Sequence, residues 1–220
     1  MVDPMKKLAW MFLKPLFQLL RPSFTFNGEK YAYFWHEYNM TWRGERAVEI
    51  PIVRKMVEQA AGKRVLEVGN VLSHYFNFPH DIVDKYEVAP QVKNEDIVTF
   101  RPKGGAYDLI ISISTLEHVG WDEKPQNPQK FARAFKNLMG PCLKPGGILV
   151  VTLPVGHNPV LDQAVRHGKI RFTQKHYLKR LGRVNHWVET DPTSVQGSKE
   201  MDPYPFANAL FVGIYRKSKK

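Results

Sequence analysis

The chain has 220 residues, of which 43% are hydrophobic and 24% charged, which is typical of a folded domain with a sizeable core. No internal repeat or low-complexity tract is present, and the single cysteine, Cys142, excludes an intrachain disulfide and a cysteine-based zinc site. The formal net charge of +11 predicts either a basic face in contact with solvent or an anionic partner. Because no RNA-binding signature accompanies this charge, nucleic acid is the less favoured partner.

Residues 1–23 form an apolar and basic segment. The apolar run is interrupted by Lys14 and Pro15, is too short for a bilayer, which needs about 20 apolar residues, and has no signal-peptide cleavage site after it. Its apolar side either packs against the body of the protein, or residues 1–22 lie on an anionic membrane surface. We favour the membrane. The lone cysteine suits a reducing compartment, so we expect a cytoplasmic protein, peripheral on the inner membrane face.

Residues 24–43 are rich in aromatic side chains. The segment either plugs the core or forms a lid with polar groups over a substrate. As candidate substrate contacts we single out His36, Tyr38, Asn39 and Arg43. Apolar residues at helical spacing predict a helix over 44–61, which ends at Gly62. We therefore divide the chain into the segment 1–23, a lid and helix over 24–61, and a main domain over 62–220.

A short buried strand is predicted over residues 65–68, where Val65, Leu66 and Val68 form an apolar run. Glu67 lies inside this run, and Gly69 follows at the carboxyl end of the strand. In open α/β sheets, ligands bind beyond these strand ends. A carboxylate in an apolar strand costs free energy unless it is paired, so Glu67 either bonds nearby backbone or receives a hydrogen bond from a ligand.

The rest of the chain alternates between strand and helix patterns. Further strands are predicted over residues 82–84, 96–97, 107–115, 148–153, 186–190 and 209–215. Further helices are predicted over residues 127–143 and 173–181. Strands that alternate with helices are typical of an α/β fold with a parallel sheet covered on both faces.

Several short motifs occur in a fixed order along residues 44–216. They are Val65-Leu-Glu-Val-Gly69, Asp84, Asp96-Ile97, Tyr107-Asp-Leu-Ile110, Leu116-Glu-His-Val119 and Leu143-Lys-Pro-Gly-Gly-Ile148. Together they resemble the class I S-adenosylmethionine-dependent methyltransferases, of the small-molecule, methyltransferase type 11-like kind. The resemblance implies a Rossmann-like, seven-stranded, mostly parallel sheet with an antiparallel last strand and helices on both faces.

The resemblance also implies a cofactor, S-adenosyl-L-methionine, and residues that bind it. Glu67 would reach the methionyl amino group, directly or through water, and Gly69 and Asn70 would form the adjoining loop. Asp84 would accept from the ribose hydroxyls, Asp96 would bind the adenine amino group, and Ile97 would pack on the adenine ring. The methionine side would be lined by Ser114, Leu116 and Glu117. The chain departs from the family after Gly69, where further glycines are often found.

The expected reaction is methyl transfer to an oxygen acceptor, which is a small molecule, a glycan or a lipid-linked compound. His118 follows the strand 107–115 and is the expected general base. No His, Asp and Glu spacing in the sequence indicates a metal site.

Two other classes of protein stay open as alternatives. A nicotinamide-dependent oxidoreductase needs a glycine-rich turn for a pyrophosphate, and this sequence offers only Gly69. A non-catalytic binding module on the same fold has no need of three acids, Glu67, Asp84 and Asp96, near strand ends. Both alternatives are therefore less favoured than a methyltransferase.

Overall fold

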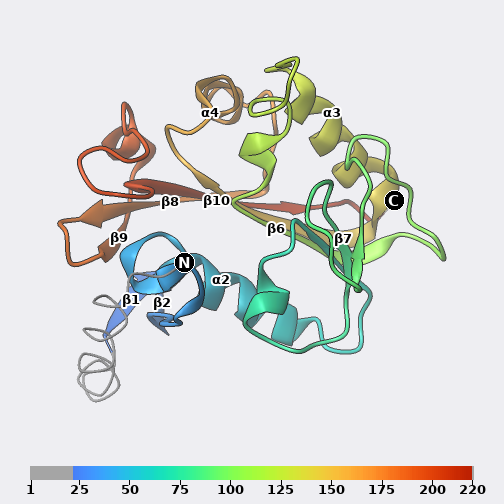
Figure 1. The fold of residues 1–220 in the computed structure, drawn as a ribbon, viewed down its shortest axis with the longest axis horizontal. Coiled ribbons are helices and arrows are strands. Elements are labelled where there is room, and N and C mark those ends of the chain that lie inside the picture. Colours follow the sequence, from blue (N-terminus) through green and yellow to red (C-terminus); the bar gives the residue numbers. More distant parts are fainter. Residues whose placement is uncertain (1–21, 220) are drawn as a thin grey trace.

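The computed structural model describes residues 22–219, which form a sheet with helices on both faces (Figure 1). The sheet has eight strands in the order β5-β4-β3-β6-β7-β10-β8-β9. In chain order these are β3 (Val65–Val68), β4 (Asp81–Val83), β5 (Val92–Lys93), β6 (Tyr107–Ile113), β7 (Leu143–Pro154), β8 (Gln174–Leu181), β9 (His186–Thr190) and β10 (Ala209–Arg216). The first five are parallel, and β10 is antiparallel to both of its neighbours.

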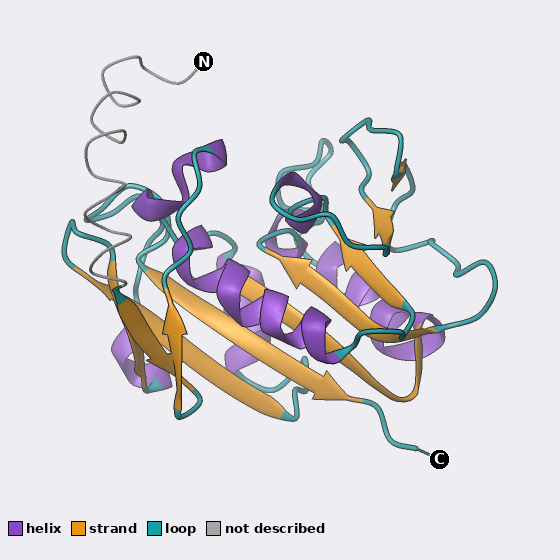
Figure 2. Ribbon diagram, turned by 90° about the horizontal axis from the view of Figure 1, so that it is seen from below, coloured by secondary structure: helices purple, strands orange, loops and turns teal. Residues whose placement is uncertain are grey.

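The helices cover the two faces of this sheet. Helix α2 (Arg46–Gln59) lies on one face, and α3 (Lys130–Asn137) and α4 (Pro159–Arg166) lie on the other (Figure 1). Figure 2 looks onto the first face and shows α2 lying across the strands. Successive side chains of β6 alternate between the faces, so Ile110 packs with α3 while Leu109 and Ile111 pack with α2. This arrangement confirms the predicted Rossmann-like α/β fold.

The register of the central strands places three carboxyl ends at one edge. Val68 of β3 pairs with Ser112 of β6, which pairs with Val151 of β7. Short helical turns follow or face these ends, and they are η1 (Tyr38–Arg43), η2 (Leu72–His74) and η3 (Leu116–His118). A π-helical turn (Leu138–Cys142) continues α3, and η5 (Pro192–Val195) follows β9. Loops from distant parts of the sequence therefore meet beyond β3 and β6.

The predicted helix over 173–181 is wrong, because these residues form β8. The strand hydrogen-bonds to β10 on one side and β9 on the other, so tertiary pairing decides its conformation. Since β8 occupies a place beside β10, the predicted strand 186–190 becomes an additional edge strand. The sheet consequently has eight strands and not seven.

The predicted strand at 96–97 is also wrong. The third strand in chain order is β5, and Asp96 begins a turn instead. Its Oδ1 accepts from the backbone N–H of Val98 at 3.0 Å, and its carbonyl oxygen accepts from Thr99 and Phe100 at 2.9 Å each. An aspartate that bonds the backbone two residues ahead favours a turn over a strand.

A hairpin and a helix, besides β5, were not predicted from the sequence. A hairpin of β1 (Ser23–Phe26) and β2 (Glu29–Ala32) turns at Asn27-Gly28, where both residues have positive φ, as a tight hairpin turn requires. Helix α4 begins after Asn158, whose side chain accepts from the N–H of Leu161 at 3.1 Å, and Pro159 is its first residue. Both signals are present in the sequence. The helices predicted over 44–61 and 127–143 are confirmed in α2 and in α3 with its π turn.

The segment expected to contact a membrane, residues 1–22, lies outside the described residues except for Pro22. Between Pro22 and Lys219, no helix combines the length and the apolar character needed to cross a bilayer.

Candidate functional site

A cavity of about 540 Å³ opens beyond the carboxyl ends of β3, β4 and β6. It brings together many of the residues predicted from the sequence. Those that line it are Tyr38, Asn39, Gly69, Asn70, Asp84, Asp96, Ile97, Ser114 and His118. The cavity has the position expected for a ligand site in an open α/β sheet.

Gly69 lies at the narrowest approach between β3 and the turn after β6. Its φ is +85°, and a Cβ atom there would lie 2.2 Å from Oγ1 of Thr115. Only glycine fits both the conformation and the space. Substitution at this position would displace the loop that carries Thr115, which also lines the cavity.

Glu67 is fully buried and does not line the cavity. Its Oε1 accepts from the N–H groups of Val71 at 3.0 Å and Leu72 at 2.7 Å, and its Oε2 lies 2.7 Å from Nε2 of His80. The sequence left two interpretations of Glu67 open. The structure agrees with the one in which Glu67 bonds to nearby backbone. Both oxygens are engaged inside the protein, so this geometry includes no direct contact with a methionyl amino group. Glu67 instead holds the loop that lacks the family's further glycines.

Asp84 follows β4 and faces the cavity with one oxygen unengaged. Oδ1 accepts from the backbone N–H groups of Tyr86 and Glu87 at 2.7 Å each. Within residues 22–219, Oδ2 of Asp84 takes part in no hydrogen bond or ion pair. The first oxygen fixes the side chain, and the second can accept from a ligand hydroxyl. Asn70 is fixed nearby by a bond from its Nδ2 to Oε1 of Glu87 at 2.5 Å.

At the end of the cavity that carries Asp96, four charged side chains form a network. Oδ2 of Asp96 lies 2.6 Å from Nζ of Lys130 and 3.2 Å from Nζ of Lys85. The same two lysines contact Glu123 at 2.6 and 3.2 Å. Burial would raise the pKa of Asp96, but the lysines and the Val98 N–H outweigh it and hold the pKa at about 2. Lys85, Glu123 and Lys130 were missed by the sequence analysis, although Lys85 directly follows a predicted site residue.

Arg46, another residue that the sequence analysis missed, also lines the cavity. It is the first residue of α2, and 18% of its side chain is exposed. Its Nη1 pairs with Oε2 of Glu49, while Oε1 of Glu49 accepts from Oγ of Ser114 at 2.5 Å. This arrangement fixes a guanidinium where a ligand carboxylate could bind.

The aromatic segment contributes two of its four predicted residues to the cavity. Tyr38 and Asn39 line it, and the Tyr38 ring stacks on His74 at 4.4 Å. His36 is exposed and stacks on Phe34, away from the cavity lining. Arg43 lies outside the lining as well, with its guanidinium 5.5 Å from the ring of Phe206.

The turn η3 presents three predicted residues in three different environments. Leu116 is fully buried in the hydrophobic core and Glu117 is buried behind the cavity wall, so neither lines the cavity. His118 does line it, is about half exposed, and has its Nδ1 2.5 Å from Oδ2 of Asp122. The histidine predicted as the base is therefore oriented by a carboxylate that the sequence analysis did not single out.

Comparison with solved structures supports the same architecture. Over 79% of this chain and 87% of the other, the chain is similar to the N-methyltransferase NodS from Bradyrhizobium japonicum WM9, which was solved in complex with S-adenosyl-L-homocysteine (13% identity, TM-score 0.50). The cyclase SpnF (13% identity, TM-score 0.48) matches over 97% of this chain and 95% of its own. A methyltransferase from Methanosarcina mazei (12% identity, TM-score 0.42) matches over 75% and 98%.

No protein-family model matches the sequence, and no curated protein does. At 13% identity, the likeness to NodS concerns the fold. The strand order and the antiparallel β10 agree with it. The chain thus has the fold of the class I S-adenosylmethionine-dependent methyltransferases, the family that its motifs resemble.

Proposed function

We propose that the protein is an S-adenosylmethionine-dependent methyltransferase that acts on an oxygen acceptor. The observation that carries this proposal is that one cavity is lined by Asp96, by Asp84 with its unengaged oxygen, and by Gly69 and Arg46. These groups suit an adenine, a ribose diol and an amino-acid carboxylate respectively. NodS, which shares the fold, was solved with S-adenosyl-L-homocysteine.

The reaction requires little from the protein besides alignment. The acceptor oxygen forms a bond to the methyl carbon while the carbon–sulfur bond breaks, the cofactor leaves as a thioether, and the acceptor loses its proton. Holding the acceptor in line behind the methyl group supplies most of the catalysis. With the adenosine end at Asp84 and Asp96, Ser114 and His118 would line the part of the cavity left for the methyl group and the acceptor.

The acceptor is proposed to enter between the turn that carries Tyr38 and the turn that carries His118. Both residues line the cavity, and each is more than 40% exposed. His118 is a titratable side chain in the cavity lining, and its assignment as the base stays a prediction. The acceptor class, a small molecule, glycan or lipid-linked compound, and contact of residues 1–22 with an anionic membrane also remain proposals.

A nicotinamide cofactor fits this site less well. A pyrophosphate requires free backbone N–H groups after the first strand. Here the N–H groups of Val71 and Leu72 are already bound by Glu67. The loop therefore has two donors fewer for a phosphate, whereas S-adenosylmethionine contains no phosphate.

Calorimetry on the full chain tests the proposal. We expect binding of S-adenosylhomocysteine but not of NAD, and Asp84→Ala should weaken the binding about tenfold, because the ribose diol loses its acceptor in a closed site at a cost of about 1–3 kcal/mol. The control is Asp191→Ala, which changes an exposed aspartate outside the cavity. The proposal would be overturned if NAD gave heat of binding and neither S-adenosylmethionine nor S-adenosylhomocysteine did.

A further inference from the structure

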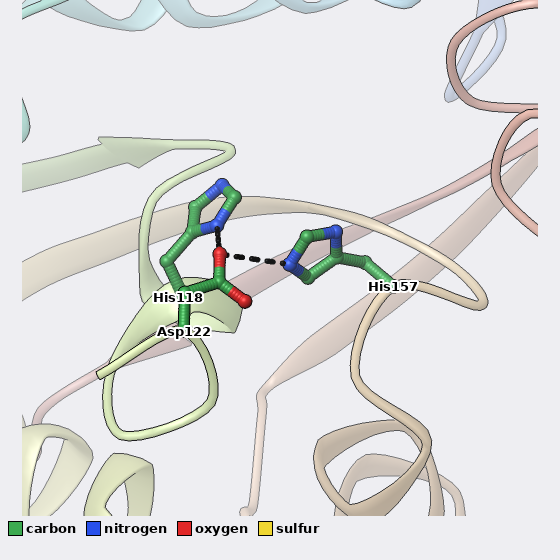
Figure 3. Close-up of side chains that lie close together, drawn as sticks. All are labelled: His118, Asp122 and His157. Carbon is green, nitrogen blue, oxygen red and sulfur yellow. Dashed lines mark hydrogen bonds and ion pairs between the residues drawn. The ribbon is translucent and has the colours of Figure 1, made fainter. Parts of the chain in front are cut away.

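Two histidines and an aspartate meet beside the cavity, from loops that are 35 or more residues apart in the sequence. His118 and Asp122 follow β6, and His157 follows β7 (Figure 3). One ligand atom of each lies within 4.8 Å of the others, the one such group of His, Cys, Asp and Glu side chains among residues 22–219. Asp122 Oδ2 is 2.5 Å from His118 Nδ1 and 3.4 Å from His157 Nε2.

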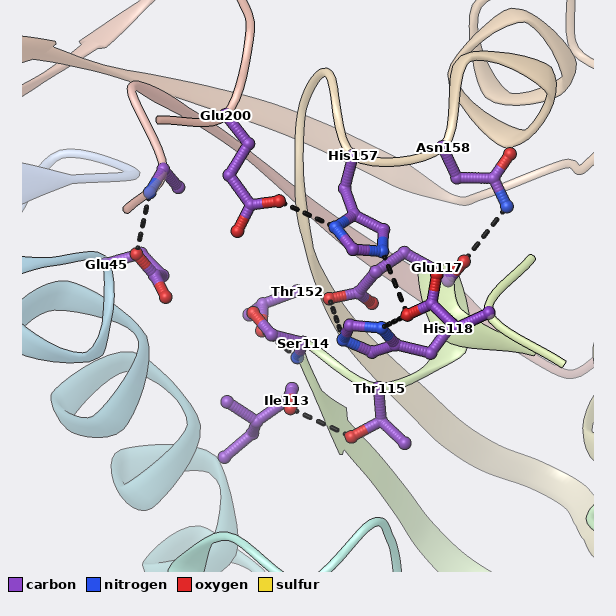
Figure 4. Close-up of polar contacts among 12 residues, drawn as sticks. Glu45, Ile113, Ser114, Thr115, Glu117, His118, Thr152, His157, Asn158 and Glu200 are labelled. Atoms are coloured by element: carbon purple, nitrogen blue, oxygen red, sulfur yellow. Dashed lines mark hydrogen bonds and ion pairs between the residues drawn. The ribbon is translucent and has the colours of Figure 1, made fainter. Parts of the chain in front are cut away.

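His157 is oriented by a second carboxylate. Its Nδ1 lies 2.6 Å from Oε2 of Glu200, which stands on the far side of the ring from His118 (Figure 4). Histidines that bind metal ions usually donate the other ring N–H to a carboxylate or a carbonyl oxygen, which fixes the tautomer. The contact with Glu200 thus turns Nε2 of His157 toward Asp122.

Nε2 of His157 is buried and has no hydrogen-bond partner among the described residues. Its contact with Asp122 at 3.4 Å is an ion-pair distance but not a hydrogen bond. Buried polar atoms in folded proteins nearly always have a hydrogen-bond partner, so a nitrogen whose polar neighbour is a carboxylate at 3.4 Å calls for a physical reason. A cation between His157 and Asp122 would give both groups a closer partner.

Glu117 adds a further buried polar group beside this cluster. Only 2% of its side chain is exposed, and neither carboxylate oxygen has a hydrogen bond within the described part of the chain. Oε1 lies 3.7 Å from Nε2 of His118. The backbone carbonyl of Glu117 accepts from Nδ2 of Asn158 at 2.9 Å, which ties the turn after β6 to the turn after β7 (Figure 4).

We propose that His118, Asp122 and His157 bind a divalent first-row transition-metal ion such as Mn²⁺, Fe²⁺, Co²⁺ or Zn²⁺. Two imidazoles and one carboxylate are a donor set that suits these ions, and the exposed faces of His118 and Asp122 leave coordination positions open. Bonds of about 2.0–2.2 Å place neighbouring ligands about 3–4 Å apart. Shifts of side chains alone can therefore close the site around an ion.

The position of this site suggests what the ion would do. His118 also lines the cavity, so an open coordination position faces the place where the acceptor is proposed to bind. A bound ion would coordinate the acceptor hydroxyl and lower its pKa, so that the proton leaves to water before the methyl group arrives. This catalytic use rests on the proposed function, whereas binding of the ion does not. His118 would then act as a ligand and not as the base.

The test is a titration of tag-free, chelator-treated full-length protein with CoCl₂, followed by visible absorption, because coordination by imidazole gives characteristic Co²⁺ bands. We expect one Co²⁺ per chain. Substitutions His118→Gln and His157→Gln should each lower the affinity tenfold or more. Circular dichroism shows that each variant is folded.

His176 provides a matched control. Its Nδ1 lies 2.7 Å from Oε1 of Glu189 and its Nε2 is also buried without a partner, but residues 22–219 place it in no candidate metal group. His176→Gln should therefore bind Co²⁺ like the wild type. The proposal is overturned if the wild type binds no Co²⁺, if both site variants bind as tightly as the wild type, or if His176→Gln loses as much affinity as they do.

Calorimetry with S-adenosylhomocysteine on the same samples separates this proposal from the proposed function. If Co²⁺ binds but the nucleoside does not, the cation site is supported and the methyltransferase assignment is refuted. Nucleoside binding without Co²⁺ binding would do the reverse, and would return His118 to its predicted role as a metal-independent base.

Discussion

Charged groups differ between two regions of the molecule, the network around Asp96 and the groups beside His118. In the region where the adenine is proposed to bind, Asp96 and Glu123 are each paired with the two lysines, Lys85 and Lys130. Beside His118, in the region where methyl transfer is proposed and which we call the reaction end, the carboxylate of Glu117 and one nitrogen of His157 are buried behind the cavity lining without hydrogen bonds from the described residues. The charged groups of the first region have partners within the protein, whereas the two groups of the second region lack hydrogen bonds from the described residues.

This difference separates groups that stabilise the fold from groups that cost stability. A buried polar atom without a partner loses its solvation with nothing in return, at about 1–3 kcal/mol. Proteins retain such groups mainly where function needs them, and their removal then stabilises the fold while activity falls. We therefore expect substitutions at the two ends to have effects of opposite sign on stability.

The largest effect is expected on catalysis at the reaction end. His118→Ala should lower methyl transfer roughly 10²-fold or more, whether the imidazole is the base or a ligand. Affinity for S-adenosylhomocysteine should stay close to that of the wild type, because the proposed nucleoside contacts, Asp84 and Asp96, are unchanged. Transfer of labelled methyl groups in a screen of acceptors measures the first effect, and calorimetry the second. Wild-type turnover in the variant would place the reaction elsewhere in the cavity.

A second substitution tests, through stability, a buried carboxylate whose two oxygens both have partners. Glu67→Ala removes the acceptor of two backbone N–H groups and the partner of His80, so we expect a loss of about 3–5 kcal/mol in the free energy of unfolding. Glu67→Gln keeps an oxygen acceptor and serves as the matched control, with a much smaller loss. Urea denaturation measures both. If the alanine variant proves as stable as the glutamine variant, the loop is not held by Glu67.

The sequence was sufficient where structure is determined locally. The apolar runs of β3, β6 and β7, and the acid at the end of β4, are read directly from neighbouring residues, and with them part of the cavity lining. It was insufficient where distant segments meet. The conformation of β8 depends on its two neighbours, and Lys130 reaches Asp96 across 34 residues.

The histidine cluster shows the same limit, with one exception. No local spacing relates His118 to His157, because each lies on its own loop. Strands β6 and β7 are parallel neighbours, however, so residues that follow their carboxyl ends must lie close together. A search for ligand-type residues after neighbouring strands, and not at fixed spacing, would have found this pair. The carboxylates of Asp122 and Glu200 would still require the structure.

A pair of variants tests the predicted opposite signs directly. Glu117→Met replaces a buried carboxyl group with an apolar side chain of similar volume and should raise the free energy of unfolding by about 1–2 kcal/mol. Asp96→Asn weakens the ion pairs with Lys85 and Lys130 and should lower it by about 1 kcal/mol. Thermal unfolding of both variants gives the signs. Two shifts in the same direction would contradict the comparison between the two ends.

The smallest expected effect appears as a dependence on pH. In the first turn of α4, close in sequence to His157, Asp162 accepts a 2.8 Å bond from the Gly156 N–H, but burial raises its pKa from 3.8 to about 6. A raised pKa means that the group favours folding below pH 3.8 and that this contribution is lost as the pH rises through about 6. The pKa of Asp96 is instead lowered to about 2, so its contribution is present above pH 3.8 and is lost as the pH falls through about 2.

Asp162→Asn keeps the oxygen that accepts from Gly156 but cannot ionise. Its melting temperature should therefore be close to that of the wild type near pH 4, and should exceed it by a growing margin as the pH rises to about 6, above which the difference levels off. Asp96→Asn should show a deficit that stays nearly constant over the same range, because Asp96 is ionised throughout. Scanning calorimetry from about pH 4 to 8 compares the two variants. A difference between Asp162→Asn and the wild type that does not change with pH would mean that Asp162 is ionised at little cost, and that this buried carboxylate is better solvated than its surroundings indicate.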